Sequence, residues 1–205
     1  DGMVTDADMV QRYRKLINEE TVRLEKMVRG LLDVSRLQAS DEIPHSNMDE
    51  LPLAIIIRNV AEKLMIKSAE KHVEFSIDAD ENIKILGNGD QMVQLILILS
   101  DNALKYSPER SIIFLSAKKL EDGSVLLCVR DQGPGIPEED IPFIWERFYK
   151  SDSSRGKDKR GTGLGLAIVK EIIQTHNEHI NVISTEGVGT EFIFSLPLVD
   201  DDEDI

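Results

Sequence analysis

The sequence predicts an α+β fold, a two-layer sandwich in which helices cover one face of a mainly antiparallel sheet, preceded by one long amphipathic helix. Residues 6–38 contain no proline and no glycine before Gly30, and their apolar side chains recur at helical spacing. From residue 41 to about 198, strand-like and helix-like stretches follow one another in mixed order, with glycine-containing turns between two strand pairs. We therefore expect a helical segment at 1–40, a domain at 41–199 and a disordered acidic tail at 200–205.

The N-terminal helix is predicted to carry one apolar stripe, because its apolar residues lie three or four positions apart. The stripe comprises Met9, Tyr13, Leu16, Ile17, Leu24, Met27, Val28, Leu31, Val34 and Leu37. A helix of this length cannot bury such a stripe by itself, and no segment nearby in the sequence is a partner of similar length. We favour a helix that pairs with another chain or another segment. The alternative is a helix that lies on its own domain.

The remaining elements follow from hydrophobic periodicity and turn residues. We expect strands near 46–48, 73–78, 83–86, 112–119, 124–130, 180–184 and 190–196, and helices near 51–71, 90–106 and 163–175. Pro52 is placed in the first turn of its helix, where its missing N–H is tolerated. A linker at 40–44 separates the first helix from the domain, and residues 131–162 are rich in loops.

Composition excludes several classes of function. The 205 residues include 38 Asp and Glu against 24 Lys and Arg, a net charge of −14 that disfavours binding to nucleic acid. The longest apolar run, Leu95 to Leu99, is far short of the ~20 residues that span a bilayer. A single cysteine, Cys128, excludes an internal disulfide and suits a reducing cytosol. With no leader-like segment at the start of the given sequence, an acidic intracellular domain is expected.

The first candidate motif is the segment 130–137, Arg-Asp-Gln-Gly-Pro-Gly-Ile-Pro, at the end of a predicted buried strand. Two glycines and two prolines form a stiff loop whose backbone can approach a ligand closely. Asp131 is then a fixed carboxylate acceptor at the base of a pocket. The alternative is a strand-ending turn with an Asp cap.

The second motif, Gly-Thr-Gly-Leu-Gly-Leu-Ala-Ile at 161–168, opens a predicted helix and can form an anion site from backbone N–H groups. It lacks the Gly-Lys-Ser/Thr of a Walker loop and the spacing of a dinucleotide fingerprint. The segment before it is predominantly basic and suits a lid over a polyphosphate, although a solvated surface loop is the alternative. Its charged residues are Lys150, Arg155, Lys157, Lys159 and Arg160 against Asp152 and Asp158.

The third motif is the helix segment 101–108, Asp-Asn-Ala-Leu-Lys-Tyr-Ser-Pro. Asn102 and Lys105 are three residues apart and share a helix face, which combines an amide oxygen for Mg²⁺ with a cation for phosphate. Taken alone, the segment is equally an ordinary helix end with a lysine near its C-terminus.

The order of these motifs resembles the catalytic domain of bacterial sensor histidine kinases, and most of all the WalK (VicK, YycG) type. The segments 101–107, 131–136, 145–150, 161–168 and 187–190 correspond to the N, G1, F, G2 and final Gly-Thr boxes of that family. The helix ending Leu-Leu-Asp-Val-Ser-Arg-Leu at 31–37 is similar to the second helix of the dimerisation and phosphotransfer hairpin.

The resemblance implies the ATP-binding α/β sandwich (Bergerat fold) shared with gyrase and Hsp90, with ATP and Mg²⁺ as ligands. Asp131 would accept a hydrogen bond from the adenine amino group, and Asn102 would hold Mg²⁺. The other implied contacts are Gly133 and Gly135 along the base; Tyr106, Ile136 and Tyr149 around the nucleoside; Lys105, Lys150, Gly161, Thr162, Gly163, Leu164, Gly165 and Leu166 at the phosphates; and Thr190 near the adenine.

A kinase of this family transfers the γ-phosphoryl group to a hairpin histidine, largely by positioning and charge neutralisation, and then to an aspartate of a response regulator. A homodimer through the helical hairpin, and a membrane-anchored parent with this part in the cytoplasm, are therefore expected.

Three features depart from the pattern. No phosphoacceptor box is present, and His45, His72, His176 and His179 lie in other contexts, so the given chain is not expected to phosphorylate itself. Ile98 stands where the family carries a second Asn, so the Mg²⁺ dependence of ATP binding should be altered. The related ATPases have their general-base Glu at this position, so hydrolysis of ATP by activated water is disfavoured. The segment 175–179 replaces the usual His-Gly-Gly turn. The open alternatives are a degenerate nucleotide-binding module and a stand-alone ATPase of the gyrase and Hsp90 kind.

Overall fold

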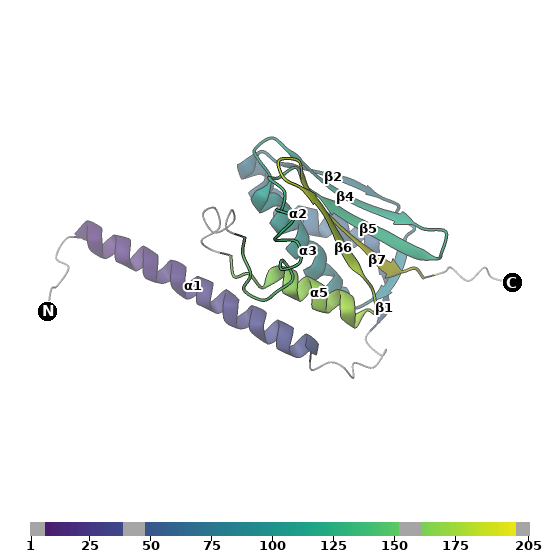
Figure 1. Cartoon of the computed structure of the whole chain (residues 1–205), viewed down its shortest axis with the longest axis horizontal. Coiled ribbons are helices and arrows are strands. Elements are labelled where there is room, and N and C mark those ends of the chain that lie inside the picture. Colours follow the sequence, from purple (N-terminus) through teal and green to yellow (C-terminus); the bar gives the residue numbers. More distant parts are fainter. Residues whose placement is uncertain (1–6, 39–47, 152–160, 200–205) are drawn as a thin grey trace.

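The computed structural model describes residues 7–38, 48–151 and 161–199. Helix α1 (Ala7–Gln38) runs along one side of the globular part, and only its C-terminal portion lies beside it (Figure 1). The domain follows in the order β1 (Asp49–Pro52), α2 (Leu53–Lys71), β2 (Glu74–Ala79), β3 (Lys84–Gly87), α3 (Gly89–Tyr106), β4 (Ile112–Lys119), β5 (Ser124–Arg130), α5 (Gly165–Thr175), β6 (Ile180–Thr185) and β7 (Gly189–Pro197).

The main sheet has five strands in the order β2-β4-β5-β7-β6. Only β2 and β4 pair in parallel, and the other neighbours are antiparallel, which confirms the predicted mainly antiparallel sheet. Strands β1 and β3 form a separate antiparallel pair. That pair is tied to the end of β7 by a bridge between Ile85 and Leu198 and by a hydrogen bond from Val199 N to Lys84 O of 3.0 Å.

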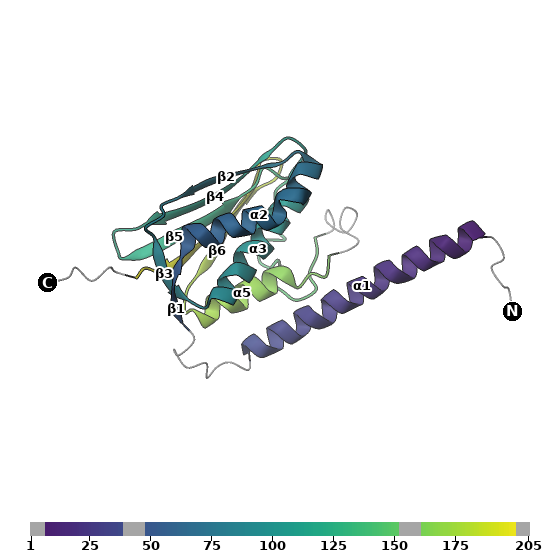
Figure 2. The same ribbon diagram turned by 180° about the vertical axis from the view of Figure 1, so that it is seen from behind.

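Helices α2, α3 and α5 lie on one face of this sheet, as the views from both sides show (Figures 1 and 2). Alternate residues of the central strands point into this layer and are buried, as expected for a sheet covered on one side. The core unites these strand residues with the inward face of α3: Ile113, Leu115, Val125, Leu127, Val129, Phe192, Phe194 and Leu196 meet Met92, Leu95, Ile96 and Leu99.

The predicted start of the second helix was wrong by two residues. Pro52 is the last residue of β1 and the N-cap of α2, with an extended backbone (φ −74°, ψ 96°). It therefore precedes the first helical turn, and the helix begins at Leu53, whose N–H donates to Ile83 O at 3.1 Å. The strand expected at 46–48 is found at Asp49–Pro52, and residues 46 and 47 lie outside the described part.

The apolar stripe of α1 divides between two surroundings, which corrects its prediction as a single stripe. Val34, Leu37 and Gly30 are buried on the side where α1 contacts α5, and so part of the helix does lie on its own domain. Val10 and Met27 are half-buried, and the remaining large apolar side chains with described burial are exposed. They are Met9, Tyr13, Leu16, Ile17, Val22, Leu24, Val28, Leu31 and Leu32.

Several predictions fall outside the described residues: the linker at 40–44, the acidic tail at 200–205 and the basic segment at 152–160. None of the helices in the three described ranges is both long enough and apolar enough to cross a bilayer.

Candidate functional site

A cavity of about 530 Å³ opens between α3, the loop after β5, the glycine-rich turn before α5 and helix α1. It collects residues from all three sequence motifs, although they are far apart in the chain. The predicted residues that line it are Asn102, Lys105, Tyr106, Asp131, Gly135, Ile136, Tyr149, Lys150, Gly161, Thr162, Gly163, Gly165, Leu166 and Thr190. Every predicted site residue except Gly133 and Leu164 therefore lines this one cavity.

Asp131 is held at the cavity wall by two backbone N–H groups. Its Oδ1 accepts from Gly133 N at 2.7 Å and from Thr190 N at 3.3 Å. Among the described residues, Oδ2 takes part in no hydrogen bond and stays available to a ligand. Burial raises the pKa of Asp131 above its ordinary value of 3.8, and the two N–H donors oppose that rise. The result is a desolvated, pre-oriented acceptor.

Gly133 and Leu164 act from behind the cavity instead of lining it. The N–H of Gly133 orients Asp131, and an added Cβ would lie 2.8 Å from Asp131 Oδ1. Leu164 is only 1% exposed and packs toward Gly30 of α1. Both residues support neighbours that face the cavity.

The loop after β5 is fastened to the hairpin of β6 and β7. Ile136 N donates to Ser184 Oγ at 2.8 Å, and Gly187 N donates to Pro134 O at 2.8 Å. Gly135 has a left-handed φ of +73°, and a Cβ there would lie 2.2 Å from Thr185 O. Only glycine fits at this position, and so the loop keeps its backbone close to the hairpin and its other side open to the cavity.

The cavity wall also combines a lysine of α3 with the glycine-rich turn. Lys105 Nζ lies 3.0 Å from Tyr106 Oη and 4.5 Å from the centre of the Tyr106 ring, which fixes this lysine beside the cavity. A Cβ added to Gly165 would lie 3.1 Å from Ile98 Cγ2 and 3.9 Å from Asn102 Nδ2. The start of α5 is therefore packed closely against the α3 face that carries Asn102.

The aromatic segment at 143–149 packs against the glycine-rich turn. Tyr149 Oη donates to Asp140 Oδ1 at 2.6 Å, and its ring lies 5.8 Å from that of Phe143. Phe148 N donates to Gly163 O at 2.8 Å. These contacts place the predicted F and G2 segments against each other.

Other residues of the cavity wall were not predicted: Lys26, Ile98, Asp101, Pro134, Ile144, Ser151 and Phe192. Phe192 belongs to a strand whose alternating pattern gives no sign of a ligand. Lys26 comes from a helix that sequence motifs do not connect with the pocket. Ile98, which departs from the family motif, also lines the wall.

The cavity residues fit a magnesium nucleotide better than a metal held by protein alone. Asn102 offers an amide oxygen, whereas the neighbouring carboxylate of Asp101 is paired with Lys67 Nζ at 2.7 Å. Among the described residues, no group of three His, Cys, Asp or Glu side chains could hold a metal ion. A cation here would need phosphate oxygens to complete its coordination.

His176, which lies in the segment 175–179 that replaces the usual His-Gly-Gly turn, has a structural role. It is buried, its Nδ1 lies 2.7 Å from Ile172 O, and its Nε2 accepts from Asn88 N at 3.2 Å. Burial lowers the pKa of His176. A neutral ring that joins α5 to the start of α3 accounts for this residue.

Residues 87–200 match the family described as histidine kinase-, DNA gyrase B- and HSP90-like ATPases, which is more than half of the chain. The chain belongs to this family. The family domain contains α3, the three motifs and all the strands from β4 onward. The predicted Bergerat-type sandwich is confirmed.

Relatives and solved structures of this family carry histidine kinase names. The chain is 32% identical over 192 residues to the sensor-like histidine kinase SenX3 of Mycobacterium tuberculosis, covering 94% of this chain and 46% of SenX3. It is 32% identical over 206 residues to the sensor histidine kinase WalK of Bacillus subtilis, covering 100% of this chain and 33% of WalK. Full-length ShkA in complex with AMPPNP superposes with a TM-score of 0.78 at 27% identity, covering 92% of this chain and 39% of ShkA. The chain thus spans less than half the length of these relatives.

Proposed function

We propose that the chain is the ATP-binding catalytic part of a two-component sensor histidine kinase. The observation that carries this proposal is Asp131. It is a buried carboxylate with one oxygen fixed by two backbone N–H groups and the other available in a cavity that is also lined by lysines and by the glycine-rich turn. An adenine amino group matches the free oxygen, and a polyphosphate matches the lysines and the glycine-rich turn.

In this proposal each part of the wall has one task. Tyr106, Ile136 and Tyr149 enclose the nucleoside, while Lys105 and Lys150 neutralise phosphate charge. Gly161, Thr162, Gly163, Gly165 and Leu166 line the polyphosphate, and Thr190 lies near the adenine. Magnesium, bound through Asn102 and phosphate oxygens, would supply charge neutralisation at the transferring group.

The reaction proposed is transfer of the γ-phosphoryl group to a histidine. The bond between the γ-phosphorus and the bridging oxygen breaks, ADP leaves, and a phosphorus–nitrogen bond forms on an imidazole. That imidazole lies on a dimerisation hairpin, of which residues 1–40 are the second helix, and residues 41–199 are the catalytic domain. The phosphoryl group then passes to an aspartate of a response regulator. We also propose a homodimeric parent protein that is anchored in the membrane, with this part in the cytoplasm.

A transphosphorylation assay tests the proposal. The chain is incubated with γ-labelled ATP, Mg²⁺ and a separate hairpin that carries an acceptor histidine, and label on the hairpin is the expected result. Asn102→Asp is expected to abolish the labelling, whereas Asn59→Asp on the outside of α2 is the matched control. A wild-type chain that binds ATP but labels no hairpin would contradict the kinase proposal.

Ile98 favours a second candidate, a nucleotide-binding module without efficient transfer. Its side chain lies within van der Waals reach of Gly165 and close to the Asn102 face, where it offers no oxygen to a metal. Binding of ATP without transfer to any hairpin is the expected behaviour of such a module. Steady release of phosphate without an acceptor would instead indicate an ATPase.

A further inference from the structure

Lys26 is a cavity residue that lies outside the domain matched by the family model. It belongs to α1, whereas every other residue of the wall lies between 98 and 192. A helix that contributes to a ligand site can sense which ligand is bound.

The position of Lys26 follows from the close approach of α1 at Gly30. A Cβ on Gly30 would lie 3.0 Å from Leu164 Cδ1 and 3.8 Å from Ile168 Cδ1, so the helix backbone rests directly on the glycine-rich turn and the first turn of α5. Val34, one helical turn further on, is fully buried. Lys26 is one turn before Gly30 on the same face, about 6 Å along the axis. Lys26 therefore lines the same cavity as Gly161 and Gly163 of the glycine-rich turn.

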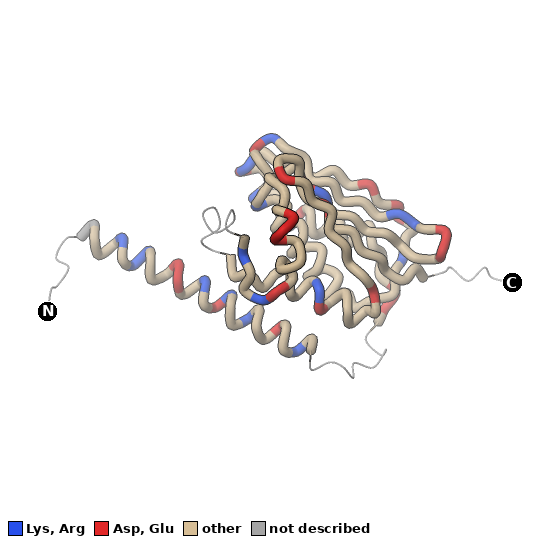
Figure 3. The backbone as a smooth tube through the Cα atoms, viewed as in Figure 1, with Lys and Arg blue, Asp and Glu red and all other residues tan. Residues whose placement is uncertain are grey.

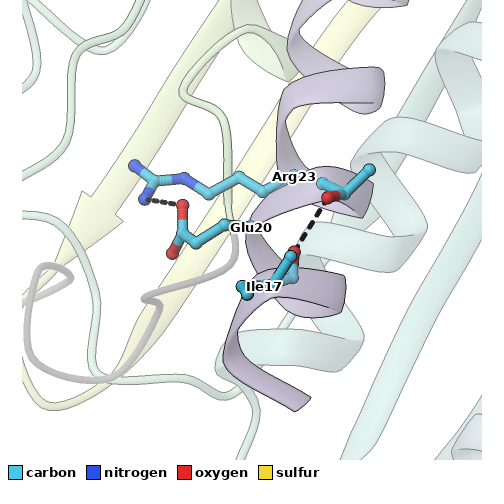
Figure 4. A network of polar contacts seen from close by, with 4 residues as sticks. Ile17, Glu20 and Arg23 are labelled. Atoms are coloured by element: carbon cyan, nitrogen blue, oxygen red, sulfur yellow. Dashed lines mark hydrogen bonds and ion pairs between the residues drawn. The ribbon is translucent and has the colours of Figure 1, made fainter. Parts of the chain in front are cut away.

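The charges along α1 leave Lys26 available to a ligand. The residues three and four positions away are Val22, Arg23, Arg29 and Gly30, none of which is acidic. Charges of both signs alternate along α1 (Figure 3). Glu20 pairs with Arg23 at 3.4 Å (Figure 4), and Glu25 pairs with Arg29 at 2.7 Å, so these nearby carboxylates have other partners on the helix. No hydrogen bond or ion pair of Lys26 is found within the described ranges.

We propose that Lys26 binds the terminal phosphate of a nucleoside triphosphate, so that the position of α1 depends on the number of phosphates in the cavity. This inference rests on the proposed function, which places the base at Asp131 and the phosphates toward the glycine-rich turn. A triphosphate extends one phosphoryl group further than a diphosphate, toward the wall that Lys26 supplies. Lys105 and Lys150 also neutralise phosphate charge in the proposed function, but they belong to the domain, so their contacts with phosphate do not depend on where α1 lies.

Coupling between ligand and helix is the consequence. If the triphosphate binds more tightly when α1 is docked, then α1 docks more tightly when the triphosphate is bound, by the same factor. Loss of the terminal phosphate removes the contact and releases that part of the docking free energy. This coupling between the terminal phosphate and α1 requires no movement of the adenine base or of Asp131.

The test compares ATP with ADP on the full chain by titration calorimetry at one fixed Mg²⁺ concentration. Lys26→Met is expected to weaken ATP binding about tenfold, the low end for a charge-assisted contact because Lys26 is exposed. ADP affinity should change less than twofold. Lys26→Arg should stay within about threefold of wild type for ATP. Lys15→Met, an exposed lysine on the same helix away from the cavity, is the matched control and should change neither.

A second variant tests the helix instead of the charge. Gly30→Leu, with Lys26 intact, is expected to push α1 away from the domain, because even a Cβ at this position would lie 3.0 Å from Leu164 Cδ1 and a leucine adds three further carbons. It should reduce the preference for ATP over ADP as much as Lys26→Met does, and the double variant should show no further reduction. Unchanged ATP affinity in Lys26→Met, or an equal loss for ATP and ADP, would overturn the inference and leave the proposed function standing. A wild-type chain that binds neither nucleotide would overturn both.

Discussion

Replacing Asp131 with asparagine exchanges one atom at the proposed base-recognition point. The amide oxygen can keep both hydrogen bonds that Oδ1 now accepts, from Gly133 N and Thr190 N. That orientation turns the amide NH₂ group toward the cavity, in place of the free carboxylate oxygen. An adenine amino group would then meet a donor where it needs an acceptor.

The expected loss follows from the burial of this position, because Asp131 is only 8% exposed. A buried hydrogen bond that involves a charged group contributes about 1.5–3 kcal/mol, and an unpaired donor adds a desolvation cost. ATP affinity should therefore fall roughly 10- to 100-fold. Folding stability should not fall with it, since burial raises the Asp131 pKa and a neutral amide avoids the cost of burying charge.

Two further readouts separate base recognition from general damage. A guanine base presents a carbonyl oxygen at the equivalent position, so Asp131→Asn should narrow the preference for ATP over GTP. In wild type, binding requires the carboxylate, and so ATP affinity should decline as the pH falls through the raised pKa of Asp131. That decline should be absent in the variant.

Calorimetric titration of ATP and GTP, paired with thermal unfolding, measures these effects. Asp122→Asn is the matched control, because Asp122 also accepts bonds from a backbone N–H and a hydroxyl but lies in the exposed turn before β5. Equal ATP affinity in wild type and Asp131→Asn, with both variants fully folded, would refute the assignment of Asp131 and the orientation of the nucleotide in the cavity.

Three other changes probe the surroundings of the cavity. Gly135→Ala should destabilise the fold by about 2–4 kcal/mol in denaturant titrations, because the added Cβ clashes with the hairpin backbone and a positive φ is itself strained for alanine. Gly123→Ala is the control: it has a φ of +81° but open space around the added Cβ, and it should cost only about 1–2 kcal/mol. His176 has a pKa lowered from 6.5, so the unfolded chain binds its proton first and stability should fall as the pH drops below about 6.5; His176→Gln should lack that step in melting curves. Ile98→Asn should strengthen the Mg²⁺ dependence of ATP affinity in calorimetry, and an unchanged dependence would show that Ile98 is irrelevant to the metal.

Most of the fold could be predicted from the sequence because its periodicity is strong. The predicted bounds of β4 and β5 agree with the structure, where alternate apolar residues enter a single core layer. Pro52 was misplaced because proline is compatible with both a first helical turn and a strand end. Pairing with Lys84 of β3, a contact with a distant part of the sequence, decides between the two.

The cavity was predictable to the extent that its motifs lie within single segments. Asp131 and Asn102 were found because loop and helix spacing place such groups at element ends. Gly133 and Leu164 belong to those motifs as well, but whether a motif residue faces the cavity or supports it depends on three-dimensional packing. Lys26 could not be found at all, since its place beside the glycine-rich turn depends on how α1 docks.

One side of α1 docks on the domain and another side carries an exposed apolar stripe. This difference favours the proposed role of α1 in a helical hairpin. At about 100° per residue, the face that contains Lys26, Gly30, Val34 and Leu37 is centred about 125° away from Leu24 in the exposed stripe. Docking on the domain therefore leaves that stripe uncovered, with Leu24 60% exposed. An exposed apolar surface of this length requires a partner. A helix alongside α1 could cover the stripe while Lys26 still reaches the cavity, so pairing with a hairpin helix and sensing of phosphate need not compete for the same face.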